Sequence, residues 1–251
     1  KQMSLNYKEI DAVLSELNLT GSFIQQIVQP GYDSLALHTY NGESKTILIC
    51  LAGGACRIHE TRKAVPKNDK PLRFMEFLRS KIKGSRIEDI YQIGSERIIF
   101  MKLTHCGETF FLYIRLWSGA ANIILTDEQN RILDSFYRRP AKGEITGGIF
   151  SLPEAKEKDE SDSKWNIRDF SEIENSENLS LNEKIDLWYS EHAGQLSREA
   201  LIEQATKFYT SRHSRMENAL HRLEKKKEEF LQGEKWKHYG DLILTYGHLI
   251  D

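Results

Sequence analysis

The sequence predicts an α+β protein, in which mostly antiparallel sheets with flanking helices are followed by a helical segment. Between residues 23 and 51, and again between residues 87 and 136, short runs rich in β-branched and aromatic residues follow one another with turn residues, not helices, between them. After residue 180, apolar residues recur at helical spacing instead. We therefore expect an α+β domain over residues 1–150, an acidic linker over 151–180, and a helical segment with a truncated coiled coil over 181–251.

The first element is expected to be a helix, because apolar residues near the start of the chain recur three or four positions apart. These residues are Leu5, Ile10, Val13, Leu14 and Leu17. Either Ser4 or Asn6 is available to cap the amino end, and Gly21 ends the helical pattern.

Three β-rich runs follow, at residues 23–28, 34–40 and 46–51. Asn41-Gly42 favours a tight type I′ hairpin, which needs positive φ at both central positions, although Glu43 and Ser44 allow a longer loop. Gly53-Gly54 lacks the spacing of a phosphate-binding loop, so we expect a turn there.

A second amphipathic helix is predicted to begin at Pro71 and to end at Gly84. Its apolar face consists of Leu72, Met75, Leu78 and Ile82. Strands are expected to resume at residues 87–91, 98–103, 109–116, 121–125 and 131–136.

The remainder of the chain changes character. Residues 151–180 are polar and acidic, and residues 156–163 are the least able to fold. Helices are predicted over residues 181–189 and 198–209. A heptad seam then consists of Tyr209, Met216, Leu220, Leu223 and Phe230. Because this seam is too short to be stable alone, we expect it to pack against an antiparallel helix.

The distribution of charge is more informative than its sum. The net charge of the chain is -2, but residues 57–102 carry twelve basic and six acidic side chains, a local charge of +6. Residues 151–203 carry six basic and fourteen acidic side chains, a local charge of -8. The acidic stretch therefore masks a basic segment that is suited to phosphate contacts.

Several classes of function find no support in the sequence. Apolar runs long enough to span a membrane, an apolar leader and the common hydrolase, phosphate-loop and zinc-protease motifs are all missing, so we expect a cytoplasmic protein without an enzymatic activity, cofactor or metal. The three cysteines have no zinc-site spacing and are expected to be reduced and mostly buried. His59-Glu60 is expected to be a surface pair, and Lys225-Lys226-Lys227 a solvated helix face.

Two segments resemble the amino-terminal domain of the NFACT family. The first is PLRFMEFLRSKIKGSRIEDIYQIGSERIIFMKL, from Pro71 to Leu103, with its basic helix, its strand and its acid-Arg-Ile triplet. The second, SGAANIILTDEQNRILD, from Ser118 to Asp134, is similar to the S-x-x-N-I-I-L-x-D and I-L-D pattern of that family. The resemblance covers residues 4–140, and more loosely the chain from Leu181 onward.

The resemblance implies a fold similar to that of formamidopyrimidine-DNA glycosylases and a function in ribosome quality control. Members of the family bind tRNA and sit on a large ribosomal subunit carrying peptidyl-tRNA, where they promote carboxy-terminal tailing of the stalled chain. The functional acid-Arg pair of the family matches Glu96 and Arg97, and an acid of its first helix matches Glu9. Both acids are usually Asp in the family, so the longer Glu changes the contact geometry.

The basic helix of residues 71–84 is expected to add phosphate contacts to this tRNA site. Its candidate residues are Arg73, Arg79, Lys81 and Lys83. Arg97 would bind a phosphate or a base edge, and Glu96 or Glu9 would accept a hydrogen bond from a base or a ribose.

The chain departs from related proteins in ways that limit the prediction. The amino-terminal Pro-Glu and the zinc-finger cysteines of the glycosylases are missing, which argues against DNA repair. An acidic stretch replaces the helix-hairpin-helix region that the family usually has, so tailing activity does not follow from the resemblance. The alternative function is a surface adhesin, since many bacterial members are described as fibronectin- or fibrinogen-binding proteins.

Overall fold

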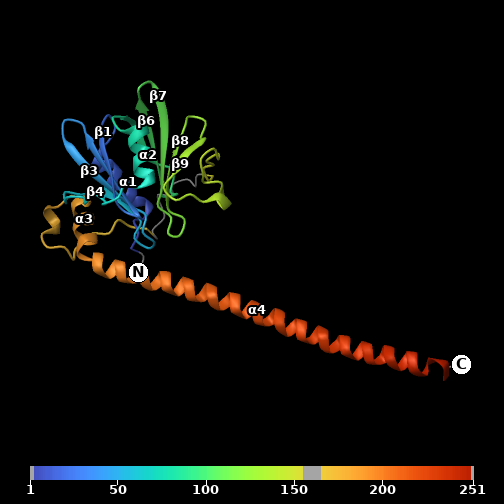
Figure 1. Cartoon of the computed structure of the whole chain (residues 1–251). Coiled ribbons are helices and arrows are strands. Elements are labelled where there is room, and N and C mark those ends of the chain that lie inside the picture. Colours follow the sequence, from blue (N-terminus) through green and yellow to red (C-terminus); the bar gives the residue numbers. More distant parts are fainter. Residues whose placement is uncertain (1–2, 155–164, 250–251) are drawn as a thin grey trace. The chain divides into compact units, whose positions relative to one another are not determined.

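An antiparallel sheet forms the centre of the first part of the chain. The computed structural model describes residues 3–154 and 165–249. Within these ranges, nine strands lie in the order β4-β3-β2-β1-β5-β6-β7-β8-β9, which confirms the α+β class (Figure 1). The strands are β1 Phe23–Gly31, β2 Ser34–Tyr40, β3 Ser44–Cys50, β4 Arg57–Glu60, β5 Arg86–Gln92, β6 Ile98–His105, β7 Glu108–Arg115, β8 Asn122–Thr126 and β9 Ile132–Ser135.

The sheet consists of two halves that meet at a narrow junction. β1 and β5 share one register pair, Phe23 with Arg86. Flanking backbone hydrogen bonds extend the junction, among them Ile24 N–H to the Ser85 carbonyl at 2.8 Å. Strands β1 to β4 therefore form one half and strands β5 to β9 the other.

Two helices lie between these halves and connect them. α1 (Tyr7–Leu17) contacts β4 and β5, whereas α2 (Arg73–Ile82) contacts β1, β6 and β9 (Figure 1). The apolar face of α1 is fully buried at Ile10 and Val13. Each such side chain contributes roughly 1.5–3 kcal/mol through burial, so the helices stabilise both halves at once.

The sequence allowed two residues to cap the amino end of the first helix, and the structure shows which one does so. Asn6, and not Ser4, is its cap: the side chain of Asn6 accepts a hydrogen bond from the Glu9 amide at 3.0 Å. The Glu9 carboxylate accepts one in return from the Asn6 amide at 2.9 Å. This reciprocal pair is a capping box, which satisfies two otherwise unpaired backbone donors.

Two details of the first half differ from expectation. The hairpin between β2 and β3 has the longer loop, because Tyr40 pairs with Ser44 and positive φ occurs at Gly42 but not at Asn41.

β4 lies outside the expected strands. The prediction of a surface pair at His59-Glu60 was wrong for His59, which is 1% exposed because both α1 and α3 pack against β4.

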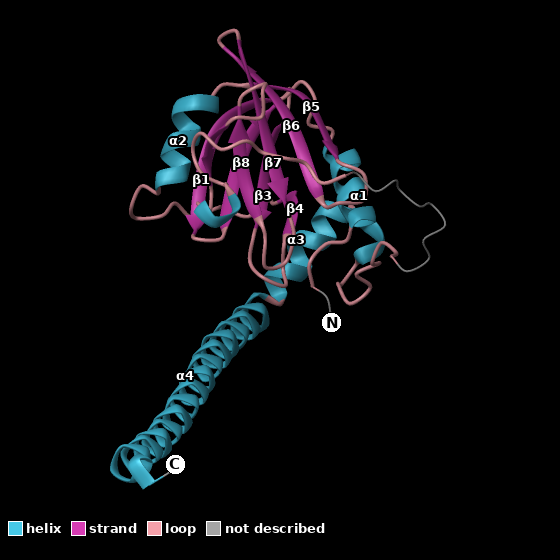
Figure 2. Cartoon of the chain, turned by 90° about the vertical axis from the view of Figure 1, so that its right-hand side faces the viewer, coloured by secondary structure: helices cyan, strands magenta, loops and turns pink. Residues whose placement is uncertain are grey.

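The boundary of the first unit also differs from the predicted one. The chain forms two compact units, Lys1–Leu196 and Ser197–Asp251. α3 (Leu181–Glu191), expected in the helical base, packs on α1 and β4 (Figure 2). Phe170 and Ile173, from the expected linker, are buried in the core of the first unit and draw this segment onto it. Residues 156–163, expected to be the least able to fold, lie outside the described residues.

The second unit is helical, as predicted. α4 (Ala193–Tyr246) is a single continuous helix of 54 residues, which includes both the helix expected over residues 198–209 and the heptad seam that follows it. The predicted heptad seam lies along it with exposed side chains, from 58% at Leu220 to 77% at Phe230. The coiled coil itself stays a prediction. No helix in the described ranges combines the length and the apolar character that crossing a membrane requires.

Candidate functional site

The loop between β5 and β6 carries Glu96 and Arg97 in an unusual backbone conformation. Its ends are joined by the Ile93 amide, which donates to the Ile98 carbonyl at 2.8 Å. Arg97 has a φ of 53°, in the left-handed region, where a side chain other than that of glycine costs energy. Backbone strain of this kind is concentrated at functional sites.

The neighbouring loop after β7 holds this strained backbone in place. The indole N–H of Trp117 donates to the Glu96 carbonyl at 2.5 Å, and the Leu116 amide donates to the Arg97 carbonyl at 2.9 Å. Because both carbonyls are fixed, the side chains of Glu96 and Arg97 extend from a rigid backbone frame. Such a frame lowers the entropy lost when a ligand binds.

The side chains of Glu96 and Arg97 are half-buried and not paired with each other. Arg97 makes one long hydrogen bond, from Nη1 to the Leu5 carbonyl at 3.4 Å, and burial lowers the pKa of its guanidinium. Within the described part of the chain, no carboxylate lies within ion-pair distance of Arg97, and the Glu96 carboxylate accepts no hydrogen bond. A half-buried cation without a counterion is suited to an anionic ligand.

Glu9, the third residue of the predicted site, is committed to the fold. It is fully buried, and its two carboxylate oxygens accept hydrogen bonds from the Arg168 side chain at 2.6 and 2.9 Å. Burial alone would lower the pKa of Arg168, but the hydrogen bonds to Glu9 outweigh it and raise that pKa. The structure therefore places Glu9 where RNA does not reach, and gives it a capping and pairing role instead.

Glu9 and Arg97 nevertheless converge on one segment, the residues that precede α1. Arg97 points to the Leu5 carbonyl, and Glu9 holds the Asn6 amide. Arg168 reaches the Ser4 carbonyl at 3.4 Å. The amino end of α1 is thus the place where the candidate residues from distant parts of the sequence meet.

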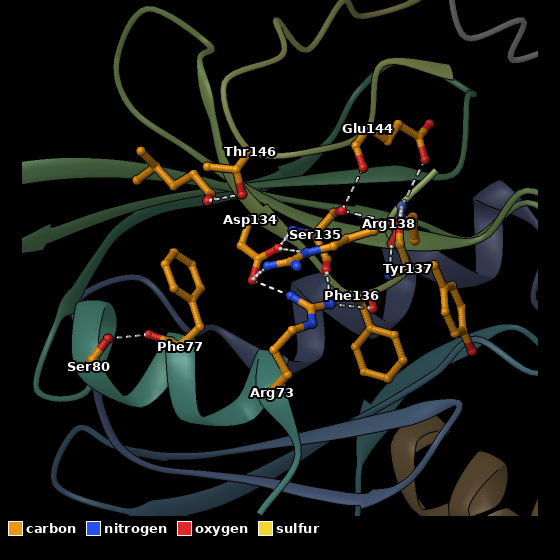
Figure 3. A network of polar contacts seen from close by, with 12 residues as sticks. Arg73, Phe77, Ser80, Asp134, Ser135, Phe136, Tyr137, Arg138, Glu144 and Thr146 are labelled. Atoms are coloured by element: carbon orange, nitrogen blue, oxygen red, sulfur yellow. Dashed lines mark hydrogen bonds and ion pairs between the residues drawn. The ribbon is translucent and has the colours of Figure 1, made fainter. Parts of the chain in front are cut away.

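The basic residues of α2 divide into two groups. Arg73 is bound to Asp134 and donates to the Ser135 and Phe136 carbonyls at 2.8 and 3.2 Å (Figure 3). Arg79 donates to the Ile27 carbonyl at 3.0 Å and pairs with Glu76 at 2.9 Å. Both arginines hold α2 to the sheet, and each is already paired with a carboxylate, which offsets its attraction for a phosphate.

Lys81 and Lys83 form the second group, because both are exposed. Lys83 lines a concavity of about 420 Å³ together with Gln26, His38 and Thr46 of the first sheet half. No acidic side chain lines this concavity. These two lysines are therefore the members of the predicted basic helix that remain available to a polyanion.

The family-like segment from Ser118 to Asp134 contributes architecture rather than a free surface. Asn122 is fully buried; its amide group donates to the Tyr137 carbonyl at 2.9 Å and to Glu144 at 2.8 Å. Asp134 binds Arg73 and Arg138, as Figure 3 shows. Asp134 thus fixes β9 to α2, and Asn122 fixes β8 to the segment that follows β9.

The three cysteines belong to no metal-binding group among the described residues. Cys50 and Cys56 are buried, Cys106 is exposed, and all three are free thiols. Burial raises the pKa of Cys56 to about 11, so this thiol stays protonated near neutral pH. Among the described residues, no group of three or more His, Cys, Asp and Glu side chains has a metal-binding arrangement.

The family model for the NFACT N-terminal and middle domains matches residues 7–174, more than half of the chain. The chain belongs to the NFACT family. It is 29% identical over 157 residues to the Rqc2 homolog RqcH of Bacillus subtilis, covering 57% of this chain and 28% of that protein. It is also 29% identical over 136 residues to the human ribosome quality control complex subunit NEMF, covering 53% of this chain and 12% of that protein. The NFACT chain thus spans less than a third of these curated relatives.

Two solved structures have a fold similar to that of this chain. The amino-terminal part of the fibronectin/fibrinogen-binding protein from Streptococcus suis superposes with a TM-score of 0.57 at 21% identity, covering 61% of this chain and 62% of that one. The amino-terminal domain of the fibronectin-binding protein PavA from Streptococcus pneumoniae gives 0.55 at 22% identity, covering 60% and 62%. At these identities the likeness concerns the fold alone.

Some residues of this site have sequence signals that the predictions did not use. The capping role of Glu9 follows from Asn6-Tyr7-Lys8-Glu9, which has the spacing of a capping box. Arg168, in contrast, lies 159 positions from Glu9 in the sequence, and no local pattern connects the two residues.

Proposed function

We propose that this NFACT chain is a non-catalytic tRNA- and ribosome-binding module of a ribosome quality-control factor. As part of a longer protein, it would hold tRNA on a large ribosomal subunit carrying peptidyl-tRNA and so promote tailing of the stalled chain. The observation that carries the proposal is the half-buried guanidinium of Arg97, which lies on a strained backbone and has no counterion among the described residues, beside a Glu96 carboxylate that accepts no hydrogen bond from them. The names of the curated relatives support the quality-control context.

The side chains of the proposed tRNA site would have different roles. Arg97 supplies a rigid fork for a phosphate or a base edge. Glu96 accepts a hydrogen bond from a base amine or a ribose hydroxyl, which disfavours RNAs that lack that donor in the same place. Lys81 and Lys83 add salt-dependent attraction to the phosphate backbone without reading sequence.

The test is tRNA recovery with the protein carrying Glu96→Ala and Arg97→Ala together. We expect loss of specific tRNA co-purification with nearly unchanged thermal unfolding, because neither side chain holds the fold. Lys81→Ala is the matched control, since it removes an exposed cation and should lower affinity only a few-fold at low salt. Equal tRNA recovery from the double variant and the unmodified protein would refute the assignment.

A second candidate function is binding of fibronectin or fibrinogen, the property named for the structurally similar streptococcal proteins. Fractionation of cells that produce the full-length protein distinguishes the two. Co-sedimentation with ribosomes supports the first function. Sensitivity to protease added outside intact cells supports the second.

A further inference from the structure

A second arginine without a carboxylate partner lies on the outer face of the first sheet half. Arg57, on β4, forms no ion pair with the described residues. Its Nε–H donates to His59 Nε2 at 3.2 Å, and its Nη1 donates to the Ala55 carbonyl at 3.1 Å. The ring of Tyr189 lies 4.3 Å from the guanidinium carbon. These contacts hold the cation in one orientation, and neither of the two hydrogen bonds uses Nη2.

His59 does not add a second charge beside Arg57. Burial, and next the charge of Arg57, lower the pKa of His59 to about 4, so the imidazole is neutral near pH 7. Because Nε2 accepts from Arg57, the proton is on Nδ1, which donates to the Glu60 carbonyl at 2.9 Å. The imidazole thus orients the guanidinium without repelling it.

Arg57 lines a cavity of about 310 Å³ between the outer face of the sheet and α3. The charged groups of the lining are Arg57, Lys63, Asp33 and Asp186. Hydroxyl donors come from Ser34, Thr61 and Ser190, and apolar walls come from Leu48, Val65 and Pro66. The volume lies at the lower end of the range for small-molecule sites, which is enough for one nucleotide.

The carboxylates in the lining restrict the class of ligand. Asp186 accepts from the Arg62 amide at 3.4 Å and lies 3.9 Å from His59 Nδ1, and neither carboxylate lies within ion-pair distance of Arg57. Bare phosphate would meet two negative groups near its cation. A nucleotide offers its phosphate to the cations and its ribose hydroxyls to a carboxylate, which is how acidic side chains hold ribose in dinucleotide sites.

We infer that this cavity binds a nucleoside monophosphate, with the phosphate on Arg57 and Lys63, a ribose hydroxyl on Asp33 or Asp186, and the base against Leu48, Val65 and Pro66. The nucleotide is either free in solution or the phosphorylated end of an RNA strand. The inference does not depend on the proposed function, because it concerns a different arginine and a different surface.

The experiment is calorimetric titration of the full chain with adenosine 5′-monophosphate, and with inorganic phosphate and acetate at matched ionic strength. We expect adenosine monophosphate to bind more tightly than phosphate, and acetate not to bind. Arg57→Gln should weaken binding by about tenfold or more, because it removes a charge-assisted contact. Arg62→Gln is the matched control, since its side chain is 77% exposed and does not line the cavity.

A second variant keeps the test valid if Arg57→Gln folds poorly. Ser190→Leu leaves Arg57 in place, fills the cavity from α3 and should abolish binding. A short RNA with a 5′-phosphate that displaces the mononucleotide, while its dephosphorylated form does not, identifies the RNA end as the source; no displacement identifies a free nucleotide. Undetectable binding at millimolar mononucleotide, equal affinity for inorganic phosphate, or unchanged affinity in both variants would overturn the inference.

Discussion

Helix α2 and the loop between β5 and β6 both carry arginines, but they use these arginines in opposite ways. Arg73 and Arg79 of α2 each bind a carboxylate and a backbone carbonyl of the sheet; the carboxylate of Arg73 is Asp134 of β9, and that of Arg79 is Glu76 of α2 itself. Arg97 of the loop binds one carbonyl at 3.4 Å and no carboxylate among the described residues. The local charge of a segment therefore does not indicate a polyanion site. The better indicator is a cation that the fold leaves without a carboxylate partner.

The largest expected effect comes from breaking the buried pair of Glu9 and Arg168. Glu9→Ala removes the capping box and leaves the half-buried Arg168 cation without its carboxylate. We expect the free energy of unfolding to fall by about 3–5 kcal/mol, the range for breaking a buried ion pair. Urea denaturation measures this change. Glu96→Ala is the matched acid, and a similar loss of stability there would remove the distinction between the two glutamates.

The next effect concerns a buried group that the fold keeps neutral. The pKa of His59 is about 4 in the folded chain, against about 6.5 for an unperturbed histidine. The folded state therefore binds fewer protons between these values. The contribution of His59 to stability is complete above pH 6.5 and is lost as pH falls toward 4, by roughly 3 kcal/mol at most. Urea denaturation between pH 7.5 and 4.5 shows this slope, and His59→Gln should flatten it.

A smaller loss of stability is expected from α2. Arg73→Ala removes the ion pair with Asp134 and two hydrogen bonds to carbonyls, but Arg138 still binds Asp134. We expect the free energy of unfolding to fall by about 1–2 kcal/mol, with tRNA affinity nearly unchanged. Parallel measurements of unfolding and of tRNA binding test this. A loss of affinity larger than that of Arg97→Ala would show that α2, and not the loop, is the main contact.

The smallest effect on stability has the opposite sign. Arg97→Gly removes the strain of a left-handed arginine and breaks one long hydrogen bond, so we expect a gain of about 0.5–1 kcal/mol in unfolding free energy. The same change should reduce tRNA binding as strongly as Arg97→Ala. Thermal denaturation and a filter-binding titration of one protein preparation give both quantities. A less stable Arg97→Gly protein would mean that the arginine helps to hold the fold.

Periodicity and turn residues predicted most of the fold, because α1, α2 and eight of the nine described strands carry their burial pattern within a few consecutive residues. β4 was not predicted, because its four residues, which include His59, do not form an apolar run. The strand is buried only by the helices that pack over it. α3 was predicted as a helix over residues 181–189, but its packing on the first unit was not. For the segment around Phe170, composition suggested a linker, whereas tertiary contacts bury Phe170 in the core.

The candidate site was predictable only in part. The acid-Arg segment marked Glu96 and Arg97, but the sequence contained no signal that Glu9 is buried under Arg168, or that Asp134 binds Arg73. Each of these pairs joins positions far apart in the sequence. Whether a charged residue is free or committed depends on such distant partners, and a single sequence does not show them.

The left-handed arginine has a consequence for how this domain responds to selection. A library selected for heat resistance alone should accumulate glycine at position 97, because every copy gains from a relaxed backbone. A library selected for growth under translational stress should keep arginine there. The residue recovered at this one position would therefore report which pressure the population experienced.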